Sequence, residues 1–116
     1  MRKGITAALA VFLAAASAAA FAQDPAGDAA RGKGLFTREM CWTCHGTEGE
    51  GGPYGPRLAP GPMGLEGLAA QVRHPRSSMP AYAPKFVSDQ DLADIHAYLA
   101  SIKPGPKASE LALLKE

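Results

Sequence analysis

The stretch Cys41-Trp42-Thr43-Cys44-His45-Gly46, CWTCHG, places two cysteines and a histidine within five consecutive positions. These are the only cysteines among the 116 residues of the chain. A disulfide between them would close a very short loop, and such C-x-x-C pairs are strained, reducible and usually redox-active. The pattern therefore leaves three interpretations: a thioredoxin-like dithiol, half of a zinc site, or the covalent attachment of a c-type haem.

The surrounding sequence favours the third interpretation. A thioredoxin-like pair belongs to a βαβ pattern, but no β-branched run precedes Cys41. A structural zinc site needs four ligands, and the remaining histidines, His74 and His96, lack the paired spacing of such a site. Haem attachment accounts for every part of the stretch, because each thiol adds to one vinyl group and His45 follows beneath the iron. We therefore predict one covalent haem c, attached through Cys41 and Cys44.

The N-terminus has the pattern of a secretory signal. Basic Arg2 and Lys3 precede an apolar run over residues 5–16, and Ala20-Phe21-Ala22 forms a small-residue cleavage site. We expect cleavage after Ala22, export to the periplasm and no membrane attachment of the mature chain. The alternative is an uncleaved anchor, since residues 5–22 approach the length that spans a bilayer.

The charge balance argues against a nucleic-acid binder. Of the 12 lysines and arginines, cleavage removes Arg2 and Lys3, leaving 10 basic against 11 acidic residues. A near-neutral chain lacks the basic surface that nucleic acid requires. Its length allows one small domain, which we place at residues 23–103, with a C-terminal tail over residues 104–116.

A second element lies downstream of the haem motif, in SSMPAYAP at residues 77–84. With CWTCHG it gives a pattern that resembles the class I bacterial monohaem cytochromes c, from about Asp28 to Ile102. The resemblance implies an all-α, small cytochrome c fold, with three to four helices wrapped around one covalently attached haem. It also implies that Met79 is the second axial ligand opposite His45, which would raise the reduction potential.

Other side chains compete with Met79 for the iron. Met40 adjoins the haem motif too closely to reach the opposite haem face, and for Met63, in a glycine-rich approach to the next helix, simple packing is the expectation. His74 could in principle give a bis-histidine site of lower potential, although loop histidines usually face solvent. We expect His96 at the surface or boundary of the last helix.

The glycine- and proline-rich stretch over residues 46–64 is expected to be a loop wrapped on the haem. Within it GPRL, residues 55–58, is similar to the family's G-P-x-L. The resemblance implies that the carbonyl of Pro56 accepts a hydrogen bond from His45, which fixes the imidazole tautomer. It also implies that Leu58 lies against the porphyrin.

Helical patterns occupy residues 28–38, 65–74 and 88–102. Ser88 is the expected N-cap of the last helix, with Asp91 three residues on, and its apolar face comprises Leu92, Ile95, Leu99 and Ile102. The resemblance implies that Gly32 and Phe36 of the first helix meet Ile95 and Tyr98 of the last. Phe36 stands one residue further from Cys41 than in the mitochondrial pattern, an extra residue that the turn should absorb.

These features predict a periplasmic one-electron carrier, or a small cytochrome subunit of a redox complex, rather than an enzyme. Iron held by His45 and Met79 has no open position for a substrate. The expected partners are redox proteins, a donor dehydrogenase or reductase and an acceptor oxidase, with the chain a monomer or a subunit. Arg73 and Arg76 could pair with haem propionates or an acidic partner. The alternative function is a haem-based gas sensor or peroxidase-like enzyme with a labile methionine ligand.

Overall fold

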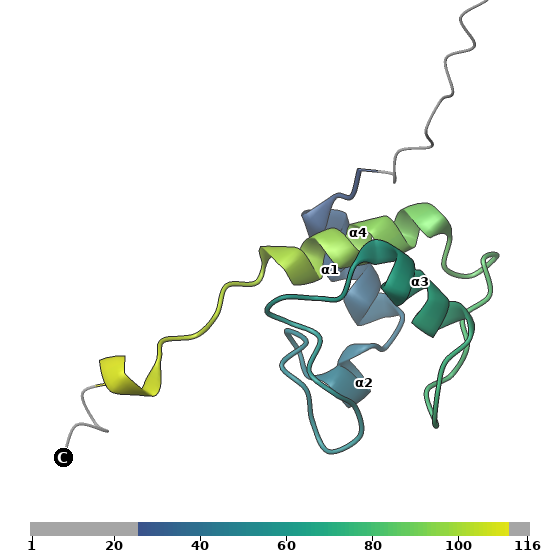
Figure 1. Ribbon diagram of the computed structural model, residues 1–116. Coiled ribbons are helices and arrows are strands. Elements are labelled where there is room, and N and C mark those ends of the chain that lie inside the picture. Colours follow the sequence, from purple (N-terminus) through teal and green to yellow (C-terminus); the bar gives the residue numbers. More distant parts are fainter. Residues whose placement is uncertain (1–25, 112–116) are drawn as a thin grey trace, which may run out of the picture.

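A computed structural model describes residues 26–111 of the protein (Figure 1). This part of the chain forms four α-helices and one short 3-10 helix: α1 (Ala29–Arg38), α2 (Trp42–His45), α3 (Leu65–Arg73), α4 (Asp89–Ser101) and η1 (Ala108–Glu110). No strand occurs between residues 26 and 111, and the predicted all-α class is confirmed. The expected signal segment, residues 1–22, and the end of the tail, residues 112–116, lie outside the described residues.

The first and last helices cross in direct contact (Figure 1). Gly32 lies at the crossing, where a Cβ atom would stand 1.9 Å from the carbonyl oxygen of Asp94 and 2.9 Å from the amide nitrogen of Ile95. Only glycine allows the backbones to approach so closely. Gly34, on the same helix, has no atom within 4 Å of its Cβ position and faces open space.

An aromatic pair extends the same contact. The rings of Phe36 and Tyr98 lie with centroids 5.6 Å apart, tilted by 56°, an arrangement that aromatic pairs favour. Both side chains are buried. The extra residue before Cys41 is absorbed in the turn after α1, where Met40 takes a positive φ of 62°. The expected pairing of Phe36 with Tyr98 is confirmed.

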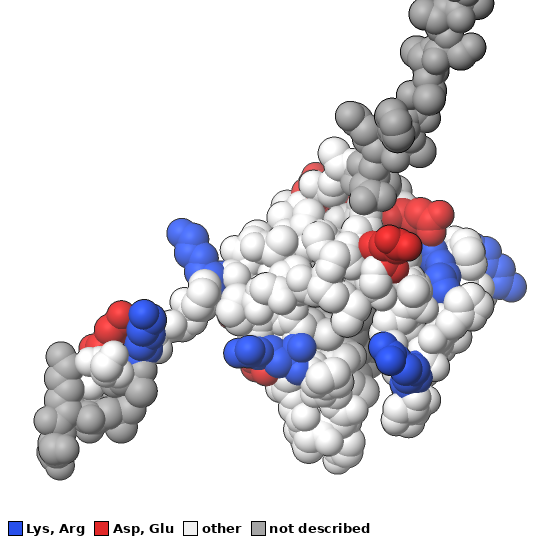
Figure 2. Space-filling view, viewed as in Figure 1, with Lys and Arg blue, Asp and Glu red and all other residues white. Residues whose placement is uncertain are grey.

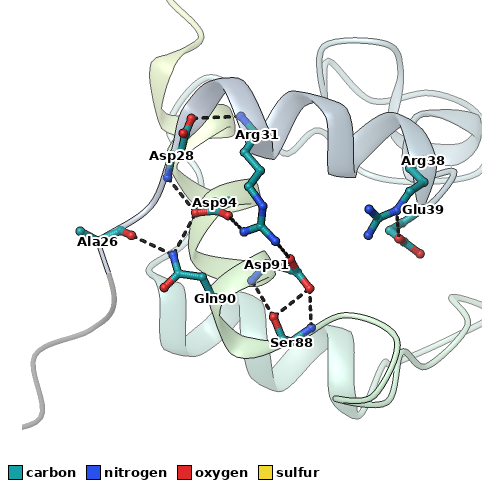
Figure 3. Close-up of polar contacts among 9 residues, drawn as sticks. All are labelled: Ala26, Asp28, Arg31, Arg38, Glu39, Ser88, Gln90, Asp91 and Asp94. Atoms are coloured by element: carbon teal, nitrogen blue, oxygen red, sulfur yellow. Dashed lines mark hydrogen bonds and ion pairs between the residues drawn. The ribbon is translucent and has the colours of Figure 1, made fainter.

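A polar cluster joins the N-terminal ends of α1 and α4 (Figure 3). The backbone N–H of Asp28 donates to the carboxylate of Asp94 at 2.8 Å, and the guanidinium of Arg31 pairs with both Asp91 and Asp94. Asp94 is only 1% exposed. Burial alone would raise the pKa of Asp94, but the hydrogen bonds from Asp28, Gln90 and Arg31 outweigh it and lower that pKa.

Local sequence determines where α4 begins and where α3 ends. Ser88 caps α4 in a capping box: its hydroxyl oxygen accepts from the backbone N–H of Asp91, and the carboxylate of Asp91 accepts from the backbone N–H and the hydroxyl of Ser88. These bonds from Ser88 are the main reason that the pKa of Asp91 is lowered. The helix expected over residues 65–74 ends at Arg73 instead, and His74 is its C-cap with φ −131°. The following Pro75 disfavours the helical conformation at His74.

The core lies where α1, α3 and α4 meet. Its buried side chains are Leu35, Phe36, Ala59, Leu68, Val72, Val87, Leu92, Ile95, Tyr98 and Leu99. Ile102, the last residue of the predicted apolar face, is only partly buried and packs against this cluster. The stretch at residues 46–64 is an ordered loop, because the amides of Leu58 and Ala59 both donate to the carbonyl of Gly49, at 2.7 and 2.9 Å.

Beyond α4 the chain extends away from the helices (Figure 1). Between residues 26 and 111, no helix combines the length and apolar character needed to cross a membrane.

Candidate functional site

A cavity of about 580 Å³ opens between the helices and the two loops beside them. Figure 2 shows two lobes with a hollow between them, and blue lysine or arginine side chains lie on both. The size lies within the range of about 300–1,000 Å³ typical of cofactor sites. All the predicted site residues line it: Cys41, Cys44, His45, Pro56, Leu58 and Met79.

The haem motif forms the short helix α2 (Trp42–His45), with Cys41 as its N-cap in helical conformation. The amide of His45 donates to the carbonyl of Cys41 at 3.1 Å, which closes the turn. Residues three and four apart share one face of a helix. This turn therefore presents Cys41, Cys44 and His45 together to the cavity.

The imidazole of His45 is buried and held in one orientation. Its Nδ1 donates a hydrogen bond to the carbonyl oxygen of Pro56 at 2.8 Å, the bond that the resemblance implied. An Nδ1 that donates leaves the other ring nitrogen, Nε2, as the free electron-pair donor. The side chain is therefore in the tautomer that can ligate a metal.

Gly55 also shapes this wall, in a way that sequence reasoning missed. A Cβ atom at Gly55 would stand 2.9 Å from both Nδ1 of His45 and the carbonyl oxygen of Cys44. The absence of a side chain lets the loop approach the imidazole closely enough for Pro56 to accept the bond. The sole sequence signal was the Gly-Pro pair itself.

The Cys41 thiol does not have the character of a redox-active cysteine. Burial raises the pKa of the Cys41 thiol to about 11, and the charge of Glu39 adds to the rise. Reactive C-x-x-C pairs depend on a thiol pKa below the usual value, so that a thiolate forms. The thioredoxin-like interpretation is thus disfavoured on electrostatic grounds.

The four candidate ligands that compete for the second axial position differ in their surroundings. Met79 is half-buried and packs against the core cluster. Met63 also lines the cavity but is 49% exposed, and its Sδ lies 3.4 Å from the Cβ position of Gly67. Met40 is more exposed still, and His74 is exposed and lies outside the cavity lining.

Met63 is anchored through its backbone. The Nε2 of His96 lies 3.0 Å from the carbonyl oxygen of Met63, which ties the loop before α3 to α4. His96 is half-buried, the boundary position expected for it. This contact fixes the backbone at Met63 and does not depend on its thioether side chain.

Arg73, the last residue of α3, and Arg76, which follows it, have different surroundings. The guanidinium of Arg73 is bound by other residues of the chain, because it donates to the carbonyl of Tyr82 at 2.8 Å and pairs with Asp89 at 2.8 Å. It does not line the cavity, whereas Arg76 does. Arg57 lines the cavity as well, although the sequence did not single it out.

Tyr82 is a further residue that sequence reasoning missed. Its hydroxyl donates to the carbonyl of Glu39 at 2.9 Å, and its amide donates to the carbonyl of Val72 at 3.0 Å. Burial raises the pKa of Tyr82, with the neighbouring Cys41 adding to the effect, so the phenol keeps its proton. These bonds attach the loop that carries Met79 to the ends of α1 and α3.

The donor set fits a haem better than a bare metal ion. Within residues 26–111, no group of three or more His, Cys, Asp or Glu side chains is arranged to hold a metal ion. The cavity instead combines two thiols, one oriented imidazole and one thioether with apolar walls. These are the groups required to attach a c-type haem and to ligate its iron.

The chain matches a known family model. The family model described as cytochrome C oxidase, cbb3-type, subunit III matches residues 27–99. This range includes both cysteines, His45, Met79 and the crossing of α1 with α4. No curated protein and no solved structure matches the chain.

Proposed function

Since the chain belongs to the cytochrome c family of the cbb3-type oxidase subunit III domain, we propose that it is a one-electron carrier with His45 and Met79 as axial ligands. It works either as a separate protein or as a small subunit of a redox complex. The observation that carries the proposal is that one cavity is lined by the cysteines and His45 together with Met79.

Membership in this family implies one covalently attached haem c, for which Cys41 and Cys44 provide the thiols. When bound, the haem supplies an iron that gains and loses one electron. The side chains of the protein hold the haem and orient the ligands of its iron. Pro56 holds the imidazole of His45 in the ligating tautomer, and this bond increases the donor strength of Nε2.

Met79 supplies a thioether, a soft and weak donor that favours the reduced iron over the oxidised iron. The loop that carries it is fastened by Tyr82 and Arg73. An iron site filled on both sides by side chains leaves no position for a substrate. The arrangement therefore supports electron transfer rather than catalysis.

The proposal includes export to the periplasm, supported by the signal pattern of residues 1–22. The partners are redox proteins that deliver and remove the electron. A place in a larger redox complex is supported by the oxidase-subunit description of the matched family.

The test of Met79 as ligand compares two methionines of the same cavity. Met79→Ala should lose the low-spin spectrum of the oxidised and reduced protein and should lower the reduction potential. Met63→Ala, the matched control, should leave both unchanged. The opposite pattern would assign the iron to Met63, and two unaffected variants would direct attention to a non-methionine ligand such as His74.

A further inference from the structure

The side chain of Gln71 reaches the sulfur of Met79. Its amide nitrogen Nε2 lies 3.9 Å from Sδ, within hydrogen-bond range for a sulfur acceptor. Gln71 is half-buried on α3 and lines the cavity. It stands three residues after Leu68, which is buried and lines the same cavity, so both lie on the cavity side of the helix.

A neighbouring arginine fixes which end of the amide faces the sulfur. The Nε of Arg76 donates to Oε1 of Gln71 at 3.5 Å. Guanidinium groups have only donors, so the carbonyl end of the amide must face Arg76. The N–H end then faces Met79, which settles the amide orientation by its hydrogen-bond partners.

From this chain of contacts we propose that Gln71, oriented by Arg76, is a positioning residue that raises the reduction potential by donating a hydrogen bond to Sδ of Met79. The inference rests on the proposed ligation by Met79. A thioether sulfur has two lone pairs, so one can face the iron while the other accepts from the amide. Hydrogen bonding withdraws electron density from the sulfur, and a poorer donor stabilises oxidised iron less than reduced iron.

The same contact holds the sulfur in place. Methionine has three flexible side-chain torsions, and the loop around Met79 includes Ser77 with a positive φ of 67°. A donor on the rigid helix α3 restricts which way the thioether turns. Gln71 thus couples the geometry of the loop to that of the helix.

The experiment measures the reduction potential and the ferric spectrum of the full haem-loaded protein and of Gln71→Leu. In the unsubstituted protein, the red charge-transfer band of a sulfur–ferric bond should be present. Gln71→Leu should keep this band and lower the potential. At a fixed ambient potential, its ratio of oxidised to reduced protein should rise about two- to thirteenfold, the size expected from one net hydrogen bond.

Two further variants separate the hydrogen bond from packing. Gln71→Glu keeps the shape of the side chain but has no N–H, so it should also lower the potential. Gln90→Leu is the matched control, because Gln90 lies on α4 and bonds to Ala26 and Asp94 instead. Its potential should equal that of the unsubstituted protein.

The role of Arg76 is tested by a double-substitution cycle. Arg76→Leu should lower the potential, and the combined Arg76→Leu and Gln71→Leu protein should show less than the sum of the two changes. Additive changes would mean that Arg76 acts only through its charge. Arg57→Leu removes another charge at the cavity and should combine additively with Gln71→Leu.

The outcomes distinguish the two layers of the argument. If the unsubstituted protein lacks the sulfur–iron band, ligation by Met79 fails and the role of Gln71 fails with it. If the band is present and Gln71→Leu leaves the potential unchanged, only the role of Gln71 is overturned. If Gln71→Leu abolishes the band, Gln71 is needed for ligation itself, and the tuning role is wrong.

Discussion

Two regions of the molecule are held together in different ways: the crossing of α1 with α4, and the cavity lined by α2 and by the loops before and after α3. At the crossing, every partner belongs to the chain: Gly32 lies against the α4 backbone, Phe36 meets Tyr98, and Asp94 is saturated by hydrogen bonds. Around the cavity, apolar side chains face a space of about 580 Å³ into which the haem-binding residues Cys41, Cys44 and His45 also point. The crossing is thus packed by contacts within the chain, whereas the cavity needs an occupant to complete its packing, and core side chains such as Phe36, Ile95 and Leu99 belong to both.

The largest expected effect comes from removing the haem attachment. Cys41→Ala with Cys44→Ala leaves the cavity without its covalent occupant. At about 24 cal/mol per Å³, an empty cavity of this size would cost up to about 14 kcal/mol if water did not enter. That is comparable with the whole stability of a small domain, about 5–15 kcal/mol. We expect loss of the haem mass and of most helical circular dichroism.

Thr43→Ser, between the same cysteines, is the control and should retain both the haem and the helical signal. A cysteine-free protein with intact helices would show that the crossing folds without the haem. The stability of the helix crossing would then be independent of the haem.

The next effect tests the crossing alone. Gly32→Val would force a side chain against the carbonyl of Asp94, 1.9 Å from the Cβ position, and should lower the free energy of unfolding by about 3 kcal/mol or more. Gly34→Ala on the same helix meets nothing and should raise it by about 0.5–1 kcal/mol. Denaturant unfolding of both variants, followed by haem absorbance and by far-ultraviolet circular dichroism, tests the two predictions.

A smaller loss of stability is expected from changing the buried carboxylate of Asp94. Asp94→Asn removes the charge that accepts from Asp28 and pairs with Arg31, and should lower the free energy of unfolding by about 2 kcal/mol. Asp89→Asn is the control, because the side chain of Asp89 is 84% exposed in its pair with Arg73. Its loss should cost under about 1 kcal/mol.

The same carboxylates set the acid sensitivity of the crossing. The pKa values of Asp91 and Asp94 are lowered from the ordinary 3.8 by the fold. Their contribution to stability is therefore complete above pH 3.8 and is lost as the pH falls through the folded-state values below it. Unfolding measured across this acid range should show a weaker pH dependence in Asp94→Asn, and an unchanged dependence would contradict the assignment.

The smallest expected effect on stability comes from Gly55, which lies against the imidazole of His45. Gly55→Ala places a methyl group 2.9 Å from Nδ1 of His45, and should lower the free energy of unfolding by about 1–2 kcal/mol. It should also weaken the bond to Pro56 and lower the donor strength of the imidazole. The potential should therefore rise in Gly55→Ala and stay unchanged in Gly64→Ala, where nothing lies within 4 Å.

The sequence anticipated the features that depend on local pattern or on a shared family motif. The capping residue Ser88, the apolar face of α4, the glycine at the crossing and the bond from His45 to Pro56 are all found in the structure. Each is encoded within a few residues, or by spacing that the family shares. The third helix ends at Arg73, one residue before the expected His74, because Pro75 disfavours the helical conformation at the residue before it.

The features that escaped prediction depend on residues far apart in the chain. Arg31 meets Asp94 across 63 positions and Tyr82 bonds to Glu39 across 43. No periodicity relates such partners, and the folded backbone alone brings them together. The contact of Gln71 with Met79 is closer in sequence, but it crosses the turn after α3, whose path the sequence does not specify.

The visible spectrum of the reduced protein, recorded before and after carbon monoxide is added, shows whether both iron positions are filled. An iron closed by His45 and Met79 has no free position, so we expect a haem c spectrum that the gas leaves unchanged. Rapid binding of carbon monoxide would contradict this expectation and would favour a gas sensor or a peroxidase-like enzyme with a labile methionine.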